Sequence, residues 1–518
     1  MTPPPPRYNF AADVFARATA WPDAVAYRDD TGTLTYAELA ARARAFAAAL
    51  GARGMRREER MLLLAQDGLD WPVAFLGALY AGVVPVAVNT LLTVDDYVYM
   101  LEHSRARAVV VSAALAATLD AALGRAAHAV DVRIVSGAPH ADATSFTALL
   151  AAATPQAQPV DTRDDDIAFW LYSSGSTGRP KAAVHTHANL HWTNVTYAQS
   201  VLGLSPADTV FSAAKLFFAY GLGNAMTFPL CAGASVVLMG ERPTPQAVWQ
   251  RIVDARPTVF FGVPTLYAAM LAATDRPARE SLRLRLCVSA GEALPRAIGE
   301  RFRAQYDVDI LDGIGSTEML HIFLSNHAGA VRYGTTGTPV AGYTVELRGE
   351  DGLAVADGEI GDLYVRGDSA ALCYWADRER SRATFVGAWT KSGDKYLRDG
   401  DGYYTYAGRG DDMLKVSGQY VSPFEVEAAL MAHPAVLEAA VIGVADADGL
   451  TRAKACVVAR AGVDAGDALA EELKAFVKDR LAPFKYPRAI EFMAELPKTA
   501  TGKIQRYRLR EREADAAR

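Results

Sequence analysis

Alanine-rich helical patterns alternate along the chain with short runs of valine, isoleucine and leucine. Two such runs are VVVS at 109–112 and SVVLM at 235–239. Short β-branched runs between helical segments are typical of parallel strands that are covered by helices. The pattern therefore predicts an α/β protein.

The stretch from Trp71 to Val88 contains no charged residue and has the minimum length of a membrane-spanning helix. Gly77, Gly82 and Pro85 interrupt it, and Pro85 lies in a β-branched run, VVPVAV. We therefore expect a buried helix, a turn and a strand here, and no contact with a membrane.

The first residues, MTPPPPRYNF, have no basic segment that leads into an apolar run, so we expect no secretory signal.

Changes in the pattern suggest how the chain is divided. A polar segment at 153–166 precedes the apolar strand IAFWLY, and we expect a subdomain to begin there. From Gly334 onward, short strands alternate with turns that contain Gly and Asp, which predicts a small twisted β unit. The segment after Asp411 predicts a compact α+β domain with a helix at 423–432, strands near 439–444 and 455–459, and a charged helix at 467–480.

Composition narrows the classes of protein that fit this pattern. With 518 residues, 51% hydrophobic and 22% charged, the chain is long enough for more than one globular domain. The net charge of −6 gives no basic excess for a nucleic-acid backbone, so we expect no nucleic-acid partner. The four cysteines have no CxxC spacing, which fits neither a zinc site nor a disulfide framework and favours a cytoplasmic protein.

The strand IAFWLY continues into SSGSTGRPKA at 173–182, a loop of hydroxyl groups and glycines that ends in Lys181. Glycines let backbone N–H groups converge on an anion, and the lysine adds a positive charge, so the loop suits a polyphosphate. It is not a Walker A loop, because the GK[ST] ending is absent. The alternative is an ordinary flexible Gly/Ser turn.

A second polar segment, ILDGIGSTEMLHIFLSN at 310–326, begins as an apolar strand and places Asp312, Thr317 and Glu318 on or after its end. Ligands of α/β proteins bind at the carboxyl ends of parallel strands, where Glu318 could hold Mg²⁺ and Thr317 a phosphate. The alternative is a helix start that is capped by Ser316 or Thr317.

Two further patterns are weaker indications of chemistry. The histidines of VHTHANLH at 184–191 resemble metal-ligand spacing, but the HExxH glutamate is absent, so packing and capping roles are favoured over zinc. The SGDK segment at 392–395 matches SxxK, but neither SDN nor KTG accompanies it, which disfavours an acyl-serine hydrolase.

Seven segments, taken together and in this order, resemble the acyl-adenylate-forming superfamily of acyl-CoA synthetases, adenylation domains and luciferases. They are YSSGSTGRPKA, SAGEALP, GIGSTE, YGTTGTPVAG, SGDK, AGRGDDMLKVSGQYVSPFEVE and PKTATGKIQR. The resemblance covers nearly all of the chain. KLFFAYGLGN at 215–224, together with the GIGSTE segment, is similar in particular to the benzoate-CoA ligase group.

The resemblance implies a two-step reaction. A carboxylate is a poor acyl donor, and its conversion to an acyl-AMP anhydride supplies a stable leaving group. The first step consumes MgATP and releases pyrophosphate, and in the second the thiol of coenzyme A displaces AMP. The expected acid is benzoate or a small ring-substituted benzoate such as 2-aminobenzoate. The alternatives are an aliphatic or longer aryl acid and, from another class, a non-catalytic nucleotide-binding protein.

The resemblance also implies a fold: a large N-terminal domain (1–410) of doubly wound α/β subdomains with a small distorted β-barrel, then a small mobile α+β domain (411–518). The hinge would lie at 408–412, with Asp411 at its centre. Lys503 would face the site for acyl-AMP formation, and Lys415 with the Ser417-Gly418 loop would face it for thioester formation with CoA.

The nucleotide-binding residues that the resemblance implies come from five segments. Ser173, Ser174, Gly175, Thr177 and Lys181 would hold the phosphates of ATP, with Thr317 near the α-phosphate and Glu318 on the magnesium. Gly291, Glu292, Asp312 and Gly313 would line the adenine, and Asp394 and Arg409 would bind the ribose with Tyr406 nearby. A carboxylate and a guanidinium suit a vicinal diol.

The acyl pocket would lie between the FFAYG segment and the GIGSTE turn. Its expected lining is Phe218, Ala219, Tyr220, Ala290, Gly313, Ile314, Gly315, Leu320 and His321. Aromatic and small residues make a flat slot for an arene. The alternative for Phe217 and Phe218 is ordinary core packing.

A homodimer, and a lysine acetyltransferase that acts on Lys503, are further partners compatible with the sequence.

Overall fold

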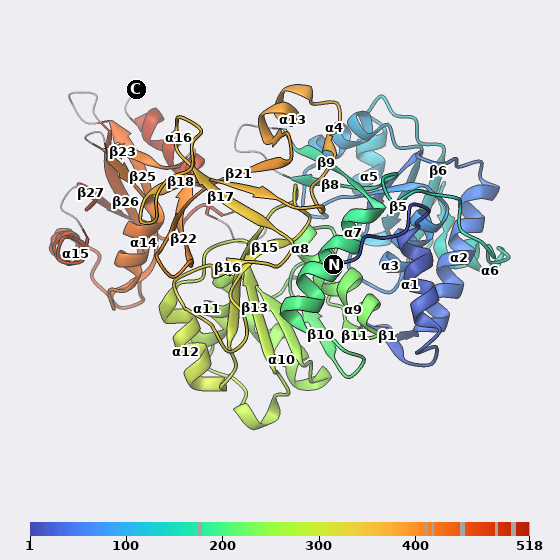
Figure 1. The fold of residues 1–518 in the computed structure, drawn as a ribbon, viewed down its shortest axis with the longest axis horizontal. Coiled ribbons are helices and arrows are strands. Elements are labelled where there is room, and N and C mark those ends of the chain that lie inside the picture. Colours follow the sequence, from blue (N-terminus) through green and yellow to red (C-terminus); the bar gives the residue numbers. More distant parts are fainter. Residues whose placement is uncertain are drawn as a thin grey trace.

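The computed structural model describes residues 1–173, 179–410, 412–416, 419–445, 451–481, 485–498 and 504–516. A large N-terminal domain is followed by a smaller C-terminal domain, and each combines helices with strands (Figure 1). The expected fold class is confirmed. The strands of the described residues form five sheets.

The first sheet has eight strands in the order β19-β9-β8-β4-β3-β5-β6-β7. Its strands are β3 (Arg60–Leu64), β4 (Val84–Ala87), β5 (Ala108–Ser112), β6 (Val132–Ser136), β7 (Thr144–Ser145), β8 (Ile167–Ser173), β9 (Lys181–Thr186) and β19 (Cys373–Tyr374). All pairs from β8 to β7 are parallel, whereas β9 and β19 run antiparallel to their neighbours. Because β8 pairs with β4, the prediction that a new subdomain begins at 153–166 is wrong.

Helices cover both faces of this sheet. They are α2 (Tyr36–Ala52), α3 (Asp70–Tyr80), α4 (Val94–Ser104), η1 (Ala113–Leu115), α5 (Ala116–Leu123) and α6 (Phe146–Ala151). Side chains alternate along β3, so Met61 and Leu63 pack in the core with α2 and α3, and Leu62 and Leu64 pack in the core with α4 and α5. Burial on both faces explains the continuous apolar runs of these strands.

The uncharged stretch from 71 to 88 folds as predicted, into α3, a turn and β4. Helix α3 is buried on all sides, and it approaches α2 so closely that a Cβ at Gly77 would lie 2.6 Å from the carbonyl oxygen of Ala43. The apolar side chains of this stretch are therefore buried in the protein core. Among the described residues, no helix has the length and apolar character needed to cross a bilayer.

The second sheet has nine strands in the order β16-β15-β14-β13-β12-β10-β11-β1-β2. They are β1 (Val25–Arg28), β2 (Thr33–Thr35), β10 (Thr209–Ser212), β11 (Ser235–Val237), β12 (Val259–Gly262), β13 (Leu286–Ala290), β14 (Ile310–Gly315), β15 (Ile322–Ser325) and β16 (Thr338–Pro339). The pairs from β1 to β14 are parallel. Strand β1 precedes all the strands of the first sheet in the sequence. It nevertheless belongs to the second sheet, where it pairs with β11.

Further helices surround the second sheet (Figure 1). They are α1 (Phe10–Ala18), α7 (His187–Thr193), the π-helix η2 (Asn194–Leu202), α8 (Ala219–Leu222), the π-helix η3 (Gly223–Thr227), α9 (Phe228–Ala232), α10 (Pro245–Ala255), α11 (Pro264–Ala272), η4 (Arg279–Ser281) and α12 (Arg296–Tyr306). Strand β15, rather than a helix, follows the GIGSTE turn, so the alternative interpretation of this segment as a helix start is wrong.

The β unit predicted after Gly334 is a five-stranded antiparallel sheet. It contains β17 (Thr344–Arg348), β18 (Ile360–Arg366), β20 (Phe385–Val386), β21 (Trp389–Arg398) and β22 (Tyr404–Arg409), with α13 (Arg378–Thr384) before β20. An isolated bridge between Gly337 and Tyr404 connects β22 to the segment before β16. The ribose residues expected on β21 and β22 thereby lie beside the second sheet.

The C-terminal domain lies at one end of the molecule (Figure 1). It contains β23 (Leu414–Val416), β24 (Gln419–Val421), α14 (Pro423–Met431), β25 (Val436–Ala445), β26 (Thr451–Ala459), α15 (Asp467–Lys478), β27 (Ala489–Phe492) and α16 (Arg506–Ala516). The predicted helices and strands are confirmed. Helix α14 begins as the sequence indicates, with Ser422 accepting the N–H of Glu425 and Pro423 in the first turn.

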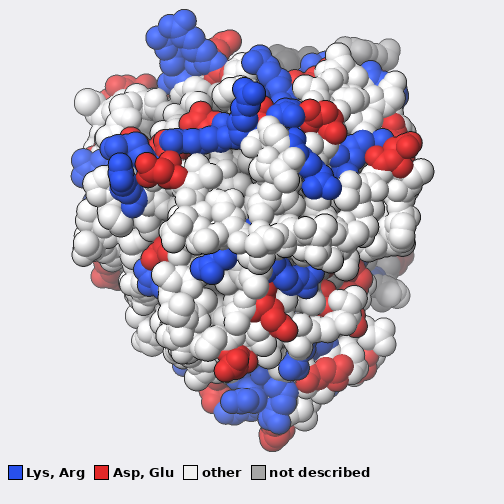
Figure 2. Space-filling view, turned by 90° about the vertical axis from the view of Figure 1, so that its right-hand side faces the viewer, with Lys and Arg blue, Asp and Glu red and all other residues white. Residues whose placement is uncertain are grey.

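Positive and negative side chains are interspersed on the face that Figure 2 shows. Ion pairs at the protein surface include those of Arg107 with Glu59 and Asp131, and of Arg125 with Asp95. Mixed charge keeps a surface hydrated without a strong field of one sign.

Asp67 lies after β3 and is buried, where its two carboxylate oxygens accept the backbone N–H of Leu216 at 3.2 and 3.3 Å. Burial raises the pKa of this carboxyl to about 6, although Lys215 and the N–H of Leu216 oppose the shift. The folded protein therefore favours the protonated acid, and the associated stability is lost as the pH rises from about 4 through 6.

We expect Asp67→Asn to raise the thermal unfolding midpoint at pH 8 and to change it little at pH 5. The amide keeps an oxygen for Leu216 and removes a buried charge that costs up to about 3 kcal/mol above pH 6. Scanning calorimetry at both pH values measures the difference, with the exposed Asp23→Asn as the control. An equal change at both pH values would contradict the assignment.

Candidate functional site

The structure describes most of the residues expected in the site, but not all of them. Ser174, Gly175, Thr177, Asp411, Ser417, Gly418 and Lys503 lie outside the described residues. For Lys415 the backbone, in β23, is described and the side chain is not.

Lys181 and Glu318, which are expected at the phosphates and the magnesium, lie in contact. Lys181 begins β9 in the first sheet, and Glu318 lies in the turn after β14 in the second. The distance from Lys181 Nζ to Glu318 Oε1 is 3.0 Å, and the hydroxyl of Tyr374 donates to the same oxygen at 2.7 Å. Burial raises the pKa of Glu318, but Lys181 and Tyr374 outweigh it and leave the pKa below its ordinary value.

Tyr374 is a residue of this cluster that sequence reasoning missed. It lies in the two-residue strand β19, which pairs with β9 so that Tyr374 is opposite Ala183. The ammonium group of Lys181 lies 4.2 Å from the centre of the Tyr374 ring, an attractive cation–π distance. No local signal in the sequence marks Tyr374, because the contact depends on the pairing of two segments far apart in the chain.

The residues expected at the adenine lie at the carboxyl ends of β13 and β14. The register pairs Ser289 with Asp312 and Ala290 with Gly313, and Gly291 turns away from β13 with a φ of +93°. Glu292 follows this turn. Ser289 Oγ and Asp312 Oδ1 are buried, and neither has a hydrogen-bond partner among the described residues. Unpaired polar atoms at the ends of parallel strands fit a polar ligand better than they fit a closed core.

Asp394 and Arg409, which are expected at the ribose, are partners across β21 and β22. Arg409 Nη1 lies 3.2 Å from Asp394 Oδ1. Gly393 has a φ of +81°, and a Cβ there would lie 3.0 Å from Arg409 Nη2, so glycine leaves room for the guanidinium. Tyr406, on β22, has its ring 5.3 Å from that of Phe424 in α14 and thus connects this region to the C-terminal domain.

The expected adenine and ribose residues approach each other at Tyr396. Burial is the main cause that raises the pKa of its hydroxyl, and Asp394 and Asp312 raise it further. The two carboxyl groups therefore act on one buried phenol. Strand β21, which carries Tyr396, therefore lies close to the end of the second sheet that carries Asp312.

Aromatic side chains surround His321 in the region expected to bind the acid. The centre of its ring lies 4.5 Å from that of Phe228, 5.0 Å from that of Tyr197 and 5.7 Å from that of Tyr220. Burial lowers the pKa of His321 to about 3, so the ring is neutral. Sequence reasoning missed Tyr197 and Phe228, because neither lies in a segment that carries the resemblance.

Glycines bring the backbone close to this aromatic cluster. A Cβ at Gly223 would lie 2.5 Å from the His321 ring, and one at Gly315 would lie 2.4 Å from the carbonyl oxygen of His321. Leu320 is buried, whereas Ile314 is only partly buried and packs against the core that contains Tyr197 and Phe228. The small residues therefore leave room for flat side chains or a flat ligand.

The two adjacent phenylalanines at 217–218 differ in burial. Phe217 is buried in the main core, which fits the core-packing alternative for this residue. Phe218 is only partly buried, and its ring centre lies 4.6 Å from that of Phe217. Ala219 begins α8 directly after it. Phe218 is therefore the more available of the two for a ligand.

The histidines at 185 and 187 are buried and hydrogen-bonded within the protein. His185 Nε2 lies 2.8 Å from the carbonyl oxygen of Thr317, and His187 Nδ1 accepts the N–H of Phe10 at 3.3 Å. Thr186 and Asn189 form a capping box at the start of α7. Packing and capping, as predicted, explain this motif. No group of three or more His, Cys, Asp or Glu side chains suited to a metal occurs in the described ranges.

Two family models match the sequence of this chain. Residues 14–375 match the model described as AMP-binding enzyme, and residues 425–503 match that of the AMP-binding enzyme C-terminal domain. The chain belongs to the AMP-binding enzyme family.

Individual relatives are similar over almost the whole chain. A benzoate–CoA ligase of Thauera aromatica is 54% identical over 517 residues, which is 98% of each chain. The crystal structure of a benzoate CoA ligase from Burkholderia xenovorans LB400 is 59% identical, with a TM-score of 0.91 over 97% of this chain and 100% of the other. That of the anthranilate CoA ligase AuaEII with anthranoyl-AMP is 39% identical, with a TM-score of 0.95 over 99% of each chain.

Proposed function

We propose that this protein is an ATP-dependent aryl-acid:CoA ligase that converts benzoate, or a small ring-substituted benzoate, into its CoA thioester. The observation that carries the proposal is the similarity over the whole chain to benzoate–CoA ligases, at 54% and 59% identity. The aromatic cluster around His321 is consistent with it, because flat rings bury an arene with few rotors to immobilise.

The first half-reaction joins the acid to AMP. Lys181 and the hydroxyl-rich loop before it hold the phosphates, while Ser289, Gly291, Glu292, Asp312 and Gly313 line the adenine. Asp394 and Arg409 bind the two ribose hydroxyls. The acid lies in the slot of Phe218, Ala219, Tyr220, Ala290, Ile314, Gly315, Leu320 and His321, so that its carboxylate faces the α-phosphate near Thr317.

Magnesium enters with ATP, and Glu318 is the side chain that would hold it. Mg²⁺ is usually bound through one or two carboxylates together with substrate phosphates, so a larger cluster is not needed. The carboxylate of Glu318 is suitable as a ligand for Mg²⁺, because Lys181 and Tyr374 keep it ionised. The bound ion would neutralise charge on the phosphates.

The second half-reaction uses the same pocket after the C-terminal domain (411–518) rotates on the large domain (1–410). Asp411 is the hinge in this proposal, within residues 408–412. Lys503 faces the pocket for adenylation, and Lys415 with the Ser417-Gly418 loop replaces it for attack by the CoA thiol. A pivot of one or two loop residues is sufficient for such a rotation.

A second acid, 2-aminobenzoate, is favoured by one observation. The fold matches that of a ligase bound to anthranoyl-AMP with a TM-score of 0.95.

The proposed location is the cytoplasm, because all four cysteines are free thiols.

We expect benzoates to be used far better than cinnamates or medium-chain fatty acids. The rings of Tyr220 and His321 and the side chain of Phe218 limit the depth of the slot, and each lost or clashing methylene-sized contact is worth roughly 1–3 kcal/mol of discrimination. Measuring kcat/KM for thioester formation across these acids, with ATP and CoA, tests the proposal. AMP and pyrophosphate are the expected by-products, and equal efficiency with a long fatty acid would rule out the small-aryl assignment.

A further inference from the structure

In the turn after β14, three consecutive backbone carbonyl groups, at 317–319, accept hydrogen bonds from other segments of the chain. The hydrogen bonds run from His185 Nε2 to the oxygen of Thr317 (2.8 Å), from the backbone nitrogen of Ala371 to that of Glu318 (2.7 Å), and from Ser369 Oγ to that of Met319 (2.8 Å). The donors come from β9 and from the segment after β18. Two distant parts of the chain therefore converge on the backbone of one turn.

Both side chains that donate are fixed by their surroundings. His185 is fully buried, and its ring stacks on that of Phe169 with the centres 5.1 Å apart. Burial lowers the pKa of His185 to about 4, so the ring carries one proton. The ring has two acceptors for that proton, the carbonyl of Thr317 at 2.8 Å from Nε2 and Oδ1 of Asn189 at 3.1 Å from Nδ1, and the shorter contact favours Nε2 as the donor.

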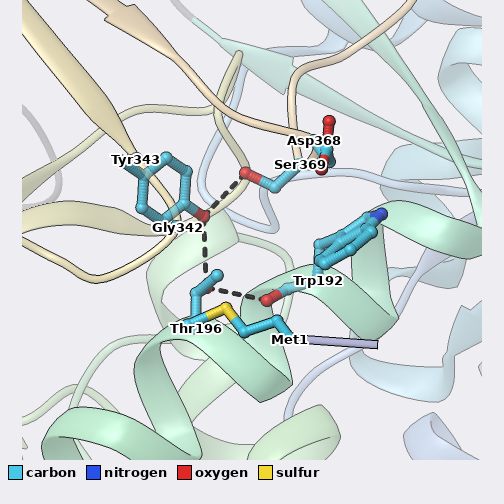
Figure 3. Close-up of a pocket in the computed structure, with 7 residues that line it drawn as sticks. All are labelled: Met1, Trp192, Thr196, Gly342, Tyr343, Asp368 and Ser369. Carbon is cyan, nitrogen blue, oxygen red and sulfur yellow. Dashed lines mark hydrogen bonds between the residues drawn. The ribbon is translucent and has the colours of Figure 1, made fainter. Parts of the chain in front are cut away.

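Ser369 is also fully buried, and its oxygen lies 2.8 Å from the hydroxyl of Tyr343. Ser369 has one proton and gives it to Met319, so Tyr343 must be the donor in this contact. Figure 3 shows the pair at the wall of a cavity of about 350 Å³ that Thr196 also lines. Tyr343 thus supports Ser369 from the cavity side, and of these two hydroxyl groups it is that of Ser369 that donates to the turn.

The turn needs this support because its backbone is strained. Leu320 has a φ of +65°, in the left-handed region, which is unfavourable for a residue with a Cβ. Such a conformation persists only where surrounding contacts determine it. Loss of an external hydrogen bond would let the turn relax and would displace Thr317 and Glu318.

We propose that His185 and Ser369 are positioning residues for the adenylation step. They act through the backbone of the turn and hold Thr317 and Glu318 in the orientation that the reaction requires. This inference rests on the proposed function, because it takes those two side chains to serve the phosphates and magnesium of ATP.

The main test compares Ser369→Ala with Tyr343→Phe. Each removes one buried hydroxyl, so both should lower the thermal unfolding midpoint. Only Ser369→Ala removes the bond to the turn, and we expect it to lower kcat for benzoyl-AMP formation by about 10- to 100-fold with KM for benzoate little changed. We expect Tyr343→Phe to keep kcat within about twofold of the parent, since the bond to Met319 remains.

A second comparison uses His185→Gln and His185→Ala. The amide nitrogen of glutamine reaches the position of Nε2 and can donate to Thr317, so the glutamine variant should recover most of the kcat that alanine loses. Binding of ATP to Ser369→Ala, measured calorimetrically with and without Mg²⁺, gives a readout other than rate. Displacement of Glu318 should reduce the gain in affinity that Mg²⁺ provides.

The outcomes separate the two proposals. A parent protein that forms no benzoyl-AMP would overturn the proposed function itself. With an active parent, an equal loss of kcat in Ser369→Ala and Tyr343→Phe, or no loss in either, would show that Ser369 has no positioning role. A His185→Gln variant no better than His185→Ala would remove His185 from it.

Discussion

Replacing Lys503 with alanine should slow formation of benzoyl-AMP by about 10²-fold or more, the scale of losing one preorganised charge. Attack of a carboxylate on the α-phosphate brings two anions together, and an ammonium group that contacts both stabilises the transition state. Quenched-flow measurement of benzoyl-AMP from benzoate and MgATP gives the rate. Acetylation of Lys503 removes the same charge and should have the same effect.

Lys498→Ala is the matched control for this prediction. Lys498 lies five residues before Lys503, and its ammonium group pairs with Glu438 at 2.6 Å in the C-terminal domain. Its loss should leave adenylation almost unchanged. Supplying benzoyl-AMP and CoA directly should restore thioester formation to Lys503→Ala, because that half-reaction uses Lys415 and the loop after it. Failure of this bypass, or normal adenylation by the variant, would contradict the assigned role.

Glu318→Gln should lower the rate of adenylation by about 10²- to 10³-fold, since the change removes the anionic ligand for magnesium and leaves Lys181 with a neutral neighbour. The carboxylate accepts from both Lys181 and Tyr374 at 3.0 and 2.7 Å. Initial rates measured over a range of Mg²⁺ concentrations should show that the concentration for half-maximal rate rises.

Tyr374→Phe provides the comparison for Glu318→Gln. It removes one hydrogen bond to the same oxygen and keeps the carboxylate, so its effect on the Mg²⁺ requirement should be much smaller. If the two variants show the same Mg²⁺ requirement as the parent, Glu318 does not hold the ion.

The alternation of apolar runs and helical patterns predicted the α/β class, α3 with β4, and the helices and strands of the C-terminal domain. It did not predict that β8 joins the first sheet or that β1 joins the second, because hydrophobic periodicity defines a strand without its partner. The subdomain boundary at 153–166 was therefore misplaced: the polar composition marks a surface loop, and the strand after it returns to pair with β4.

The candidate site shows the same limit. Motifs identified Lys181, Glu318, Asp394 and Arg409, and the structure places these residues in two contacting pairs. Tyr374 and Ser369 lie in segments without a recognisable pattern, and their contacts with Glu318 and Met319 arise only from tertiary packing. Periodicity also could not distinguish Phe217 from Phe218, because neighbouring residues at a helix start differ in burial only once the helix is docked.

The pairing of Tyr27 in β1 with Val236 in β11 has a consequence for the order in which the protein acquires its structure. At about 5–20 residues per second, ribosomal synthesis delivers β11 roughly 10–40 s after β1. In that interval the strands from β3 to β8 can assemble into the first sheet, while β1 can pair only with β2, which follows it directly in the sequence. The amino-terminal strand therefore joins the second sheet only after the first sheet has been synthesised, and a nascent chain halted before residue 235 would leave the edge of β1 that pairs with β11 exposed to aggregation or proteolysis.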